Sequence, residues 1–341
     1  MAPSQAPRRL TRRDALRLGV GVSAFSALAG CGVTEGGDGE DAGSAFPERP
    51  VQLIVPFAPG GSTDLIARTL TKEIAEPLGE SMLVVNRDGA AAAVGTKEVV
   101  AASPDGYKIG FPPSSLFTLT PQLVSGANKV SLDDLRIVTG LTVENIVIVA
   151  HKDSPYRSLD DLIKLKGTGK KITYAHSGLG TGAYFAQTAF YKLAGVDATD
   201  VPFGGGGPAV TAVLGKQTDI GASQPAESMK LVQSGELRWL GVFSAERSPL
   251  LPDVPTAREK GFELTVDQVR FIAGPKGLPD DVTETLRKAF AEAVKAPAYG
   301  DFLTKNFIDR FEKNGDEVTA RIKGDLERYK GLIDRFGIQP K

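Results

Sequence analysis

Glycines and small hydroxyl residues gather in this chain where strand-like runs give way to helix-like runs. The first such segment follows the β-rich run Val51–Phe57. Glycines at the end of a strand let the backbone approach a ligand closely, and the start of the next helix offers unpaired N–H groups and a positive dipole end. Such donors suit an anion such as a carboxylate. The segment reads Pro59-Gly60-Gly61-Ser62-Thr63-Asp64.

The side chains of this segment have different expected roles. Ser62 and Thr63 carry hydroxyls that can cap the helix or donate to a bound oxygen. Asp64 would repel a carboxylate, so it fits better as a first-turn residue that complements the helix dipole or as a partner for a ligand ammonium. A plain glycine turn before a capped helix remains the alternative.

Two further segments repeat the same order of strand, glycines and helix. In open α/β sheets ligands bind beyond the carboxyl ends of the strands. Three such loops therefore predict a cleft that holds an anion mainly through backbone N–H groups. The two segments are His176-Ser177-Gly178-Leu179-Gly180-Thr181 and Phe203-Gly204-Gly205-Gly206-Gly207-Pro208.

Enzymatic alternatives use the same glycines. Residues 178–183 fit the loose G-x-G-x-x-A dinucleotide fingerprint, so an exported nucleotide-binding oxidoreductase is the alternative function, although the expected ribose-binding acid is missing after the next strand. A hydrolase elbow would need glycines at 175 and 179, where Ala175 and Leu179 stand. A structural or ligand-facing His176 is favoured over a catalytic one. We predict no catalytic residue and no cofactor.

Alternating strand-like and helix-like segments predict an α/β fold with largely parallel sheets. Ile66, Leu70, Ile74 and Leu78 form one helical stripe, and Asn145–His151 is an apolar run of buried-strand length. A net charge of −1 gives no basic field for nucleic acid. Two histidines and one cysteine leave little for a metal site, and none is predicted.

The first 45 residues are predicted to be a targeting signal followed by a tether. Arginines precede a short apolar run, and Thr11–Asp14 carries a twin-arginine pattern, so residues 1–31 fit an export signal. Leu28-Ala29-Gly30-Cys31 resembles a bacterial lipobox, in which Cys31 is acylated. Residues 32–45 are glycine-rich and acidic, which indicates a flexible tether. The alternatives are a basic N-terminal arm and a chance cysteine.

Several longer segments carry a family resemblance. They resemble the receptors of tripartite tricarboxylate transporters, the Bug-type solute-binding proteins, over nearly all of the chain after the tether. The segments are Phe46–Pro50, Pro56–Asp64, Ser103–Tyr107, Ile172–Ala175, Ser244–Thr256 and Ala273–Gly277.

The resemblance implies a two-domain, flytrap-like periplasmic-binding-protein fold of type II. The second α/β unit closes its sheet near Phe243, so the helix-rich tail after about Val266 is predicted to return to the first domain. Residues 46–145 with 266–341 are thus predicted as domain 1 and 146–265 as domain 2. The resemblance further implies a small carboxylate ligand in the interdomain cleft and membrane permease subunits as partners. The lipobox-like residues around Cys31 predict a lipid-anchored location outside the cytoplasm.

Residue by residue, the resemblance places the ligand between two sets of loops. Phe57 and Pro59–Asp64 would contact it from the first domain. The second domain would contribute Ser177, Gly178, Gly180 and Thr181, with Phe203, Gly204 and Gly205 beside them. His176, which departs from the family beside the serine, is a further candidate contact. The chain departs from the family where Ala91-Ala92-Ala93 replaces the usual Gly-Gly-Asn, so an asparagine contact is expected to be lost.

Overall fold

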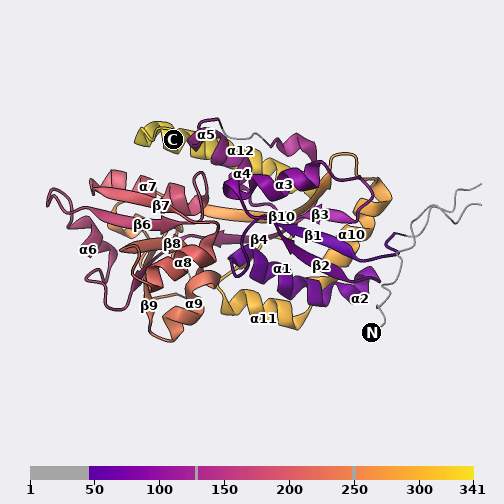
Figure 1. The fold of residues 1–341 in the computed structure, drawn as a ribbon, viewed down its shortest axis with the longest axis horizontal. Coiled ribbons are helices and arrows are strands. Elements are labelled where there is room, and N and C mark those ends of the chain that lie inside the picture. The colour runs from indigo at the N-terminus through magenta and orange to yellow at the C-terminus, as the bar shows by residue number, and fades with distance from the viewer. Residues whose placement is uncertain (1–45, 127–129, 248–250) are drawn as a thin grey trace, which may run out of the picture. The chain divides into compact units, whose positions relative to one another are not determined.

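The computed structural model describes residues 46–126, 130–247 and 251–341. The predicted export signal with Cys31 and the predicted tether lie outside the described residues. Two sheets, each covered by helices on both faces, make up the described chain (Figure 1). The strands are β1 Val51–Val55, β2 Met82–Asn86, β3 Lys108–Gly110, β4 Leu135–Asn145, β5 Val147–His151, β6 Ile172–His176, β7 Ala198–Pro202, β8 Ile220–Ser223, β9 Leu237–Val242, β10 Asp267–Pro275 and β11 Asp309–Arg310.

Helices of very different length connect these strands. The α-helices are α1 Ser62–Glu73, α2 Ala75–Leu78, α3 Ala93–Val100, α4 Ser115–Thr118, α5 Thr120–Leu123, α6 Leu159–Ile163, α7 Gly182–Ala194, α8 Gly206–Leu214, α9 Pro225–Gln233, α10 Asp280–Ala293, α11 Pro297–Lys305 and α12 Gly315–Phe336. The 3₁₀ turns are η1 Ala90–Ala92, η2 Leu132–Asp134 and η3 Arg258–Lys260.

The first lobe is built on a six-stranded sheet in the order β11-β4-β10-β3-β1-β2. Successive side chains of a strand point to opposite faces. Val51, Leu53 and Val55 of β1 therefore pack into the core under α1, α2 and α10, whereas Ile54 packs into the core under α3, α4 and the start of α12. The predicted stripe on α1 and α2 is confirmed, since all four of its residues are buried.

The second lobe is built on a five-stranded sheet in the order β7-β6-β8-β5-β9. The apolar run predicted as a buried strand is β5, and its alternate side chains enter two cores. Ile148 and Ala150 pack with α6 and α7, while Val147 and Val149 pack with α8.

The expectation of largely parallel sheets is wrong, because both sheets are mixed. β1 is parallel to β2 and β3, and β6 is parallel to β7 and β8. β10 is antiparallel to β3 and β4, β11 to β4, and β5 to β8 and β9. The reason lies in the crossings between the lobes. The chain leaves the first sheet at the end of β4 and returns at the start of β10, where Asn145 pairs with Asp267, so these two strands must run in opposite directions.

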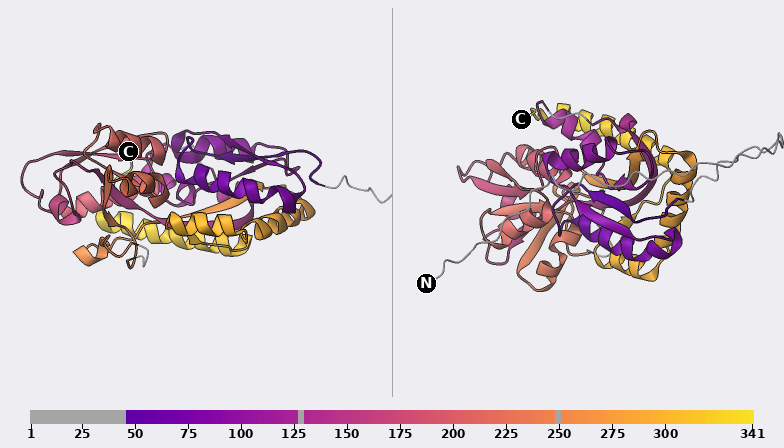
Figure 2. Two further views of the ribbon diagram at one scale, coloured as in Figure 1. Left: turned by 90° about the horizontal axis from the view of Figure 1, so that it is seen from below. Right: turned by 45° about the vertical axis from the view of Figure 1, so that its right-hand side comes forward.

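Helix α12 packs against both lobes (Figure 2). Near its start, Val318 and Ile322 enter a core of the first lobe. Towards its end, Tyr329, Ile333 and Phe336 enter a core of the second lobe. The C-terminal segment therefore takes part in both cores.

Among the residues that the structure describes, no helix is both long enough and apolar enough to cross a membrane.

Candidate ligand-binding cleft

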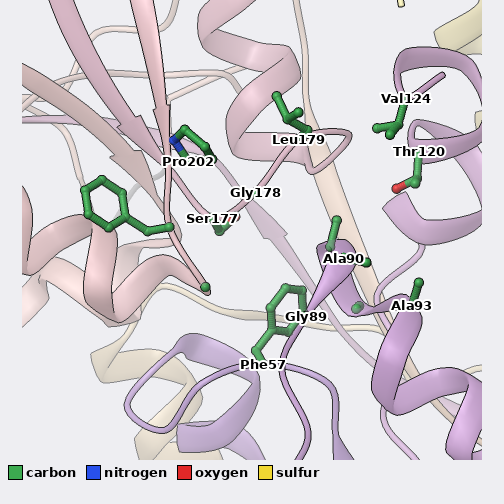
Figure 3. A pocket seen from close by; sticks show the side chains of 14 residues that line it. Phe57, Gly89, Ala90, Ala93, Thr120, Val124, Ser177, Gly178, Leu179 and Pro202 are labelled. Carbon is green, nitrogen blue, oxygen red and sulfur yellow. The ribbon is translucent and has the colours of Figure 1, made fainter. Parts of the chain in front are cut away.

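A cavity of about 390 Å³ lies between loops of the two lobes. Apolar side chains form most of its wall. In Figure 3, Phe57, Ala90 and Ala93 of the first lobe lie across from Ser177, Gly178 and Leu179 of the second. The lining residues are Phe57, Gly89, Ala90, Ala91, Ala92, Ala93, Thr120, Val124, Ser177, Gly178, Leu179, Pro202, Phe203 and Gly204.

The turn between β1 and α1 is organised by Asp64. Its carboxylate accepts hydrogen bonds from the Gly60 N–H at 3.0 Å, from Arg68 Nε at 2.9 Å and from Asn86 Nδ2 at 3.0 Å. Burial raises the pKa of Asp64, but the bonds from Arg68, Gly60 and Asn86 outweigh it and hold the pKa below its usual value. Gly60 has φ +82°, a conformation that glycine adopts without strain. Asp64 therefore shapes the loop from within and is not aimed at the cavity.

The hydroxyls of Ser62 and Thr63 bind a buried ion pair below the loop. Ser62 Oγ lies 2.6 and 2.8 Å from the two oxygens of Glu144, and Arg270 Nε donates to Thr63 Oγ1 at 2.7 Å. Arg270 Nη1 also pairs with Glu144. Burial lowers the pKa of Arg270 to about 9, which leaves the guanidinium charged at neutral pH. The two hydroxyls thus attach the first turn of α1 to β4 and β10, the strands at which the chain crosses between the lobes.

The first N–H group of α1 is taken by a carboxylate from the second lobe. Ser62 N donates to Glu227 Oε1 at 2.9 Å, across 165 positions of sequence. Glu227 Oε2 also accepts from the Gln224 N–H at 2.9 Å, and the Gln224 amide, turned so that it donates, lies at the same distance. Burial raises the pKa of Glu227 to about 7 despite the bonds from Ser62 and Gln224.

Glu227 belongs to a small recess beside the main cavity. The recess and the cavity share Phe57 and Ser177, so the two spaces adjoin. The recess is lined by Phe57, Gly61, Ser62, Thr63, Ser177, Gly206, Gln224, Glu227, Gln268 and Arg270.

The loop after β6 begins helix α7 with a network of short hydrogen bonds. Thr181 is the N-cap, and its Oγ1 accepts from the Tyr184 N–H at 3.3 Å and donates to the Gly178 carbonyl at 2.7 Å. Ser177 Oγ donates to Thr181 Oγ1 at 3.2 Å. Gly178 and Gly180 have φ +120° and +78°, which explains the glycines.

His176 is enclosed in the second lobe. Its ring packs near Tyr174 and Tyr184, with centroids 6.0 and 5.0 Å away. Its Nε2 lies 3.4 Å from Asp200, and its Nδ1 accepts from the Gly178 N–H at 3.1 Å. Burial lowers the pKa of His176, so the ring is neutral at pH 7 and supports the loop rather than facing the cavity.

The two lobes touch at the rim of the cavity. Ala58 N donates to the Gly204 carbonyl at 3.4 Å, and Thr120 Oγ1 donates to the Gly180 carbonyl at 3.2 Å. These contacts bring the first and third predicted loops together, and they bring α5 against the second.

The predicted site residues divide into three groups. Phe57, Ser177, Gly178, Phe203 and Gly204 line the main cavity, and Gly61, Ser62 and Thr63 line the recess. The other predicted residues support the loops and are not among the lining residues of either space: Pro59, Gly60, Asp64, His176, Gly180, Thr181 and Gly205.

Sequence reasoning missed the alanine segment, α5 and Glu227. Ala90, Ala91 and Ala92 all have positive φ, of 45°, 51° and 83°, which no propensity argument for alanine predicts. For Glu227 a local signal existed: Gln224-Pro225-Ala226-Glu227 has the proline and acid of a helix start. Its contact with Ser62 could not be predicted from the neighbouring sequence, because the two residues are 165 positions apart.

Among residues 46–126, 130–247 and 251–341, no group of three histidine, cysteine or carboxylate residues is placed to hold a metal ion.

Comparisons with known proteins agree over most of the chain. A family model described as the tripartite tricarboxylate transporter family receptor matches residues 66–338. A UPF0065 protein of Bordetella pertussis is 31% identical over 299 residues, covering 87% of this chain and 92% of that protein.

Solved structures show the same architecture. The periplasmic binding protein BugD is 28% identical, with a TM-score of 0.82 over 87% of this chain and 100% of its own. MatC from Rhodopseudomonas palustris, solved with bound malate, is 26% identical, with a TM-score of 0.75 over 84% of this chain and 100% of its own. The predicted two-domain periplasmic-binding-protein fold is confirmed.

Proposed function

Since the chain belongs to the tripartite tricarboxylate transporter receptor family, we propose that it captures a small carboxylate outside the cytoplasm and delivers it to the permease subunits of such a transporter. The family predicted from the sequence is thereby confirmed. The cavity between the lobes is the single observation that carries the proposal for the binding site.

The composition of the cavity wall supports a ligand held without a cationic side chain. Among the described lining residues none is lysine, arginine or histidine, so the donors are backbone N–H groups and hydroxyls. The bound malate of MatC supports a carboxylate as the ligand class. Apolar side chains from Phe57, Val124 and Leu179 favour, within that class, an organic acid with a hydrocarbon or aromatic body.

We propose the ligand contacts in the same terms. The carboxylate lies near Ser177 and the first turn of α1, and the body of the ligand fills the apolar space. The supporting residues hold the loops in place. The domain limits that we propose remain 46–145 with 266–341 and 146–265, with the end of α12 packed on the second domain.

A thermal-shift screen against mono-, di- and tricarboxylates tests the function. A true ligand at 100 times its Kd stabilises the folded protein by ~2.7 kcal/mol, which is readily measured. Titration calorimetry of Ser177→Ala with the best acid then tests the site. Loss of one hydroxyl bonded to a carboxylate costs about 1.5–3 kcal/mol, so affinity should fall by about ten- to a hundredfold. If no carboxylate stabilises the protein, the proposed ligand class is wrong.

Export and lipid anchoring form the second half of the proposal. They depend on residues 1–31 and Cys31, outside the described residues. Cys31→Ser should release the protein from the membrane fraction of its producing cell. Unchanged membrane association would contradict a lipid anchor.

A further inference from the structure

Glu227 accepts two backbone N–H groups of the kind that an anionic ligand uses. The start of α1, a helix of 12 residues, directs the Ser62 N–H at Glu227 Oε1. The start of α9 directs the Gln224 N–H at Glu227 Oε2. N–H groups at helix starts attract negative charge, and here the protein's own carboxyl group receives them.

Two glycines make room for this carboxyl group. A Cβ added to Gly206, the first residue of α8, would lie 1.9 Å from Glu227 Oε2. A Cβ added to Gly61, the N-cap of α1, would lie 3.4 Å from Glu227 Oε1. Three helix starts, those of α1, α8 and α9, therefore surround one carboxyl group. Any side chain at Gly206 would displace it.

The charges that face this carboxyl group leave it without a cation of its own. From β4 and β10 the recess receives Glu144 and Arg270, which are paired with each other. On α1, Asp64 is paired with Arg68. Gln268 and Gln224 are neutral. An ionised Glu227 would therefore give the recess a net negative charge beside the cavity.

We propose that Glu227 is a specificity-determining residue that occupies the anion position of the cleft, so that a ligand carboxylate binds the form of the receptor in which Glu227 carries a proton. The inference rests on the proposed function, because it assumes that the ligand is a carboxylate. Two carboxylates in adjoining spaces repel each other when both are ionised, as like charges disfavour the charged form of a neighbouring acid. Protonation of Glu227 removes this repulsion and gives its carboxyl group an O–H donor in the recess.

The free receptor is prepared for this step. The pKa of Glu227 is raised to about 7, so the proton is held by about half of the molecules at neutral pH. Binding of a carboxylate raises that pKa further, and the receptor takes up a proton as it binds. Affinity should then fall by up to about tenfold for each pH unit above 7. Glu227→Gln imitates the protonated form and should bind the same acid with a Kd that does not change with pH.

Titration calorimetry of the mature receptor tests this, with acids that stay almost fully ionised from pH 7 to pH 9. Malate, adipate and benzoate are suitable first probes. For the wild type we expect the Kd to rise above pH 7. In buffers of different ionisation enthalpy at pH 8, roughly one proton should be taken up per ligand. Glu227→Gln should show neither effect and should bind at least tenfold more tightly than the wild type at pH 8.5. Glu76→Gln, which removes the same charge from the exposed surface of α2, is the matched control and should behave as the wild type.

The possible results separate this inference from the function. A pH-independent Kd in the wild type, or equal pH dependence in Glu227→Gln, would overturn the role of Glu227 and leave the receptor function in place. If the wild type and Glu227→Gln both fail to bind any acid of the carboxylate screen at every pH, the carboxylate function itself is wrong, and the inference falls with it.

Discussion

At the scale of single residues, the buried pair of Arg270 and Glu144 supports the cleft without reaching the cavity. Glu144 is fully buried and Arg270 is 2% exposed. Each also binds a hydroxyl on the first turn of α1, from Ser62 and Thr63. A buried pair adds little net stability, but loss of one partner leaves an uncompensated charge in the interior.

Arg270→Met should therefore lower the free energy of unfolding by about 3–5 kcal/mol. The double variant Arg270→Met with Glu144→Gln removes the orphaned charge, so it should recover much of this loss. Urea unfolding of the parent, both single variants and the double variant measures the coupling between them. If the two single losses simply add, the pair does not act as a unit.

Glu227 gives the stability of the receptor a pH dependence of its own. Its pKa is raised from 4.5 to about 7 in the folded chain. Between these values the folded chain holds a proton that the unfolded chain has lost, so this group's contribution to stability falls as pH rises from about 4.5 to 7. Above pH 7 it changes no further.

Glu227→Gln should remove this dependence. The free energy of unfolding of the variant, minus that of the wild type, should grow between pH 5 and pH 7.5 by up to about 3 kcal/mol. Urea unfolding of both proteins at both pH values measures this difference. The contributions of other titrating groups are the same in both proteins and cancel. A constant difference would show that the folded chain does not raise the pKa of Glu227.

At the scale of elements, the alanine segment between β2 and α3 holds an unusual backbone beside the cavity. Three consecutive alanines have positive φ, where an L-residue with a Cβ is strained. The segment nevertheless lines the cavity, and its methyl groups add to the apolar wall. The strain thus lies beside the cavity, and Ala91 and Ala92 stand where the resemblance had implied glycines.

Ala91→Gly should test this strain. Relief of the left-handed conformation contributes about 1–2 kcal/mol, and the greater freedom of glycine in the unfolded chain costs about 0.4–1 kcal/mol. The variant should therefore be more stable by up to about 1.6 kcal/mol in urea unfolding. It should bind an apolar acid more weakly, because a methyl group is lost from the wall of the cavity. Destabilisation on the scale of an ordinary helix Ala→Gly change would contradict a strained backbone.

The elements also show how far local sequence patterns reach. Runs such as β1 and β5 and the stripe on α1 were predictable because each is a local pattern of apolar spacing or β propensity. The strands β4 and β10, which connect the lobes, were missed, because polar residues such as Glu144 and Arg270 interrupt their apolar pattern. These residues are satisfied by each other and by hydroxyls of α1, which are far away in the sequence. The glycine loops could be located from the sequence. Their hydrogen-bond partners could not, since Ser62 and Glu227 come from opposite lobes.

At the scale of the whole described chain, two strand crossings and one long helix connect the lobes. Asp267, at the start of β10, pairs with Arg321 and Arg328 of α12, and Tyr329 donates to its carbonyl at 2.9 Å. These bonds tie α12 to the crossing point, while its end packs on the second lobe. A movement of one lobe against the other would have to bend the chain at these two crossings and along α12.

The contact between Gly180 and Thr120 positions α5 at the rim of the cavity, where Leu119 and Leu123 on either side of Thr120 pack into a core of the second lobe. A Cβ added to Gly180 would lie 2.8 Å from the Thr120 Cα, a contact with backbone that cannot be relieved by a rotamer change. Gly180→Ala should therefore push α5 away from the second-lobe loop, deform the wall of the cavity at Thr120 and Val124, and weaken ligand binding by at least about tenfold, a loss of ~1.4 kcal/mol. Gly79→Ala is the matched control: Gly79 has φ +80° against +78° for Gly180, and its added Cβ would meet nothing within 4 Å.

Both variants should lose about 1–2 kcal/mol of stability through the left-handed backbone, but only Gly180→Ala should lose affinity. Calorimetric titration and urea unfolding of both variants separate the two effects. Equal affinities would mean that the ligand is bound without the contact between α5 and the second-lobe loop.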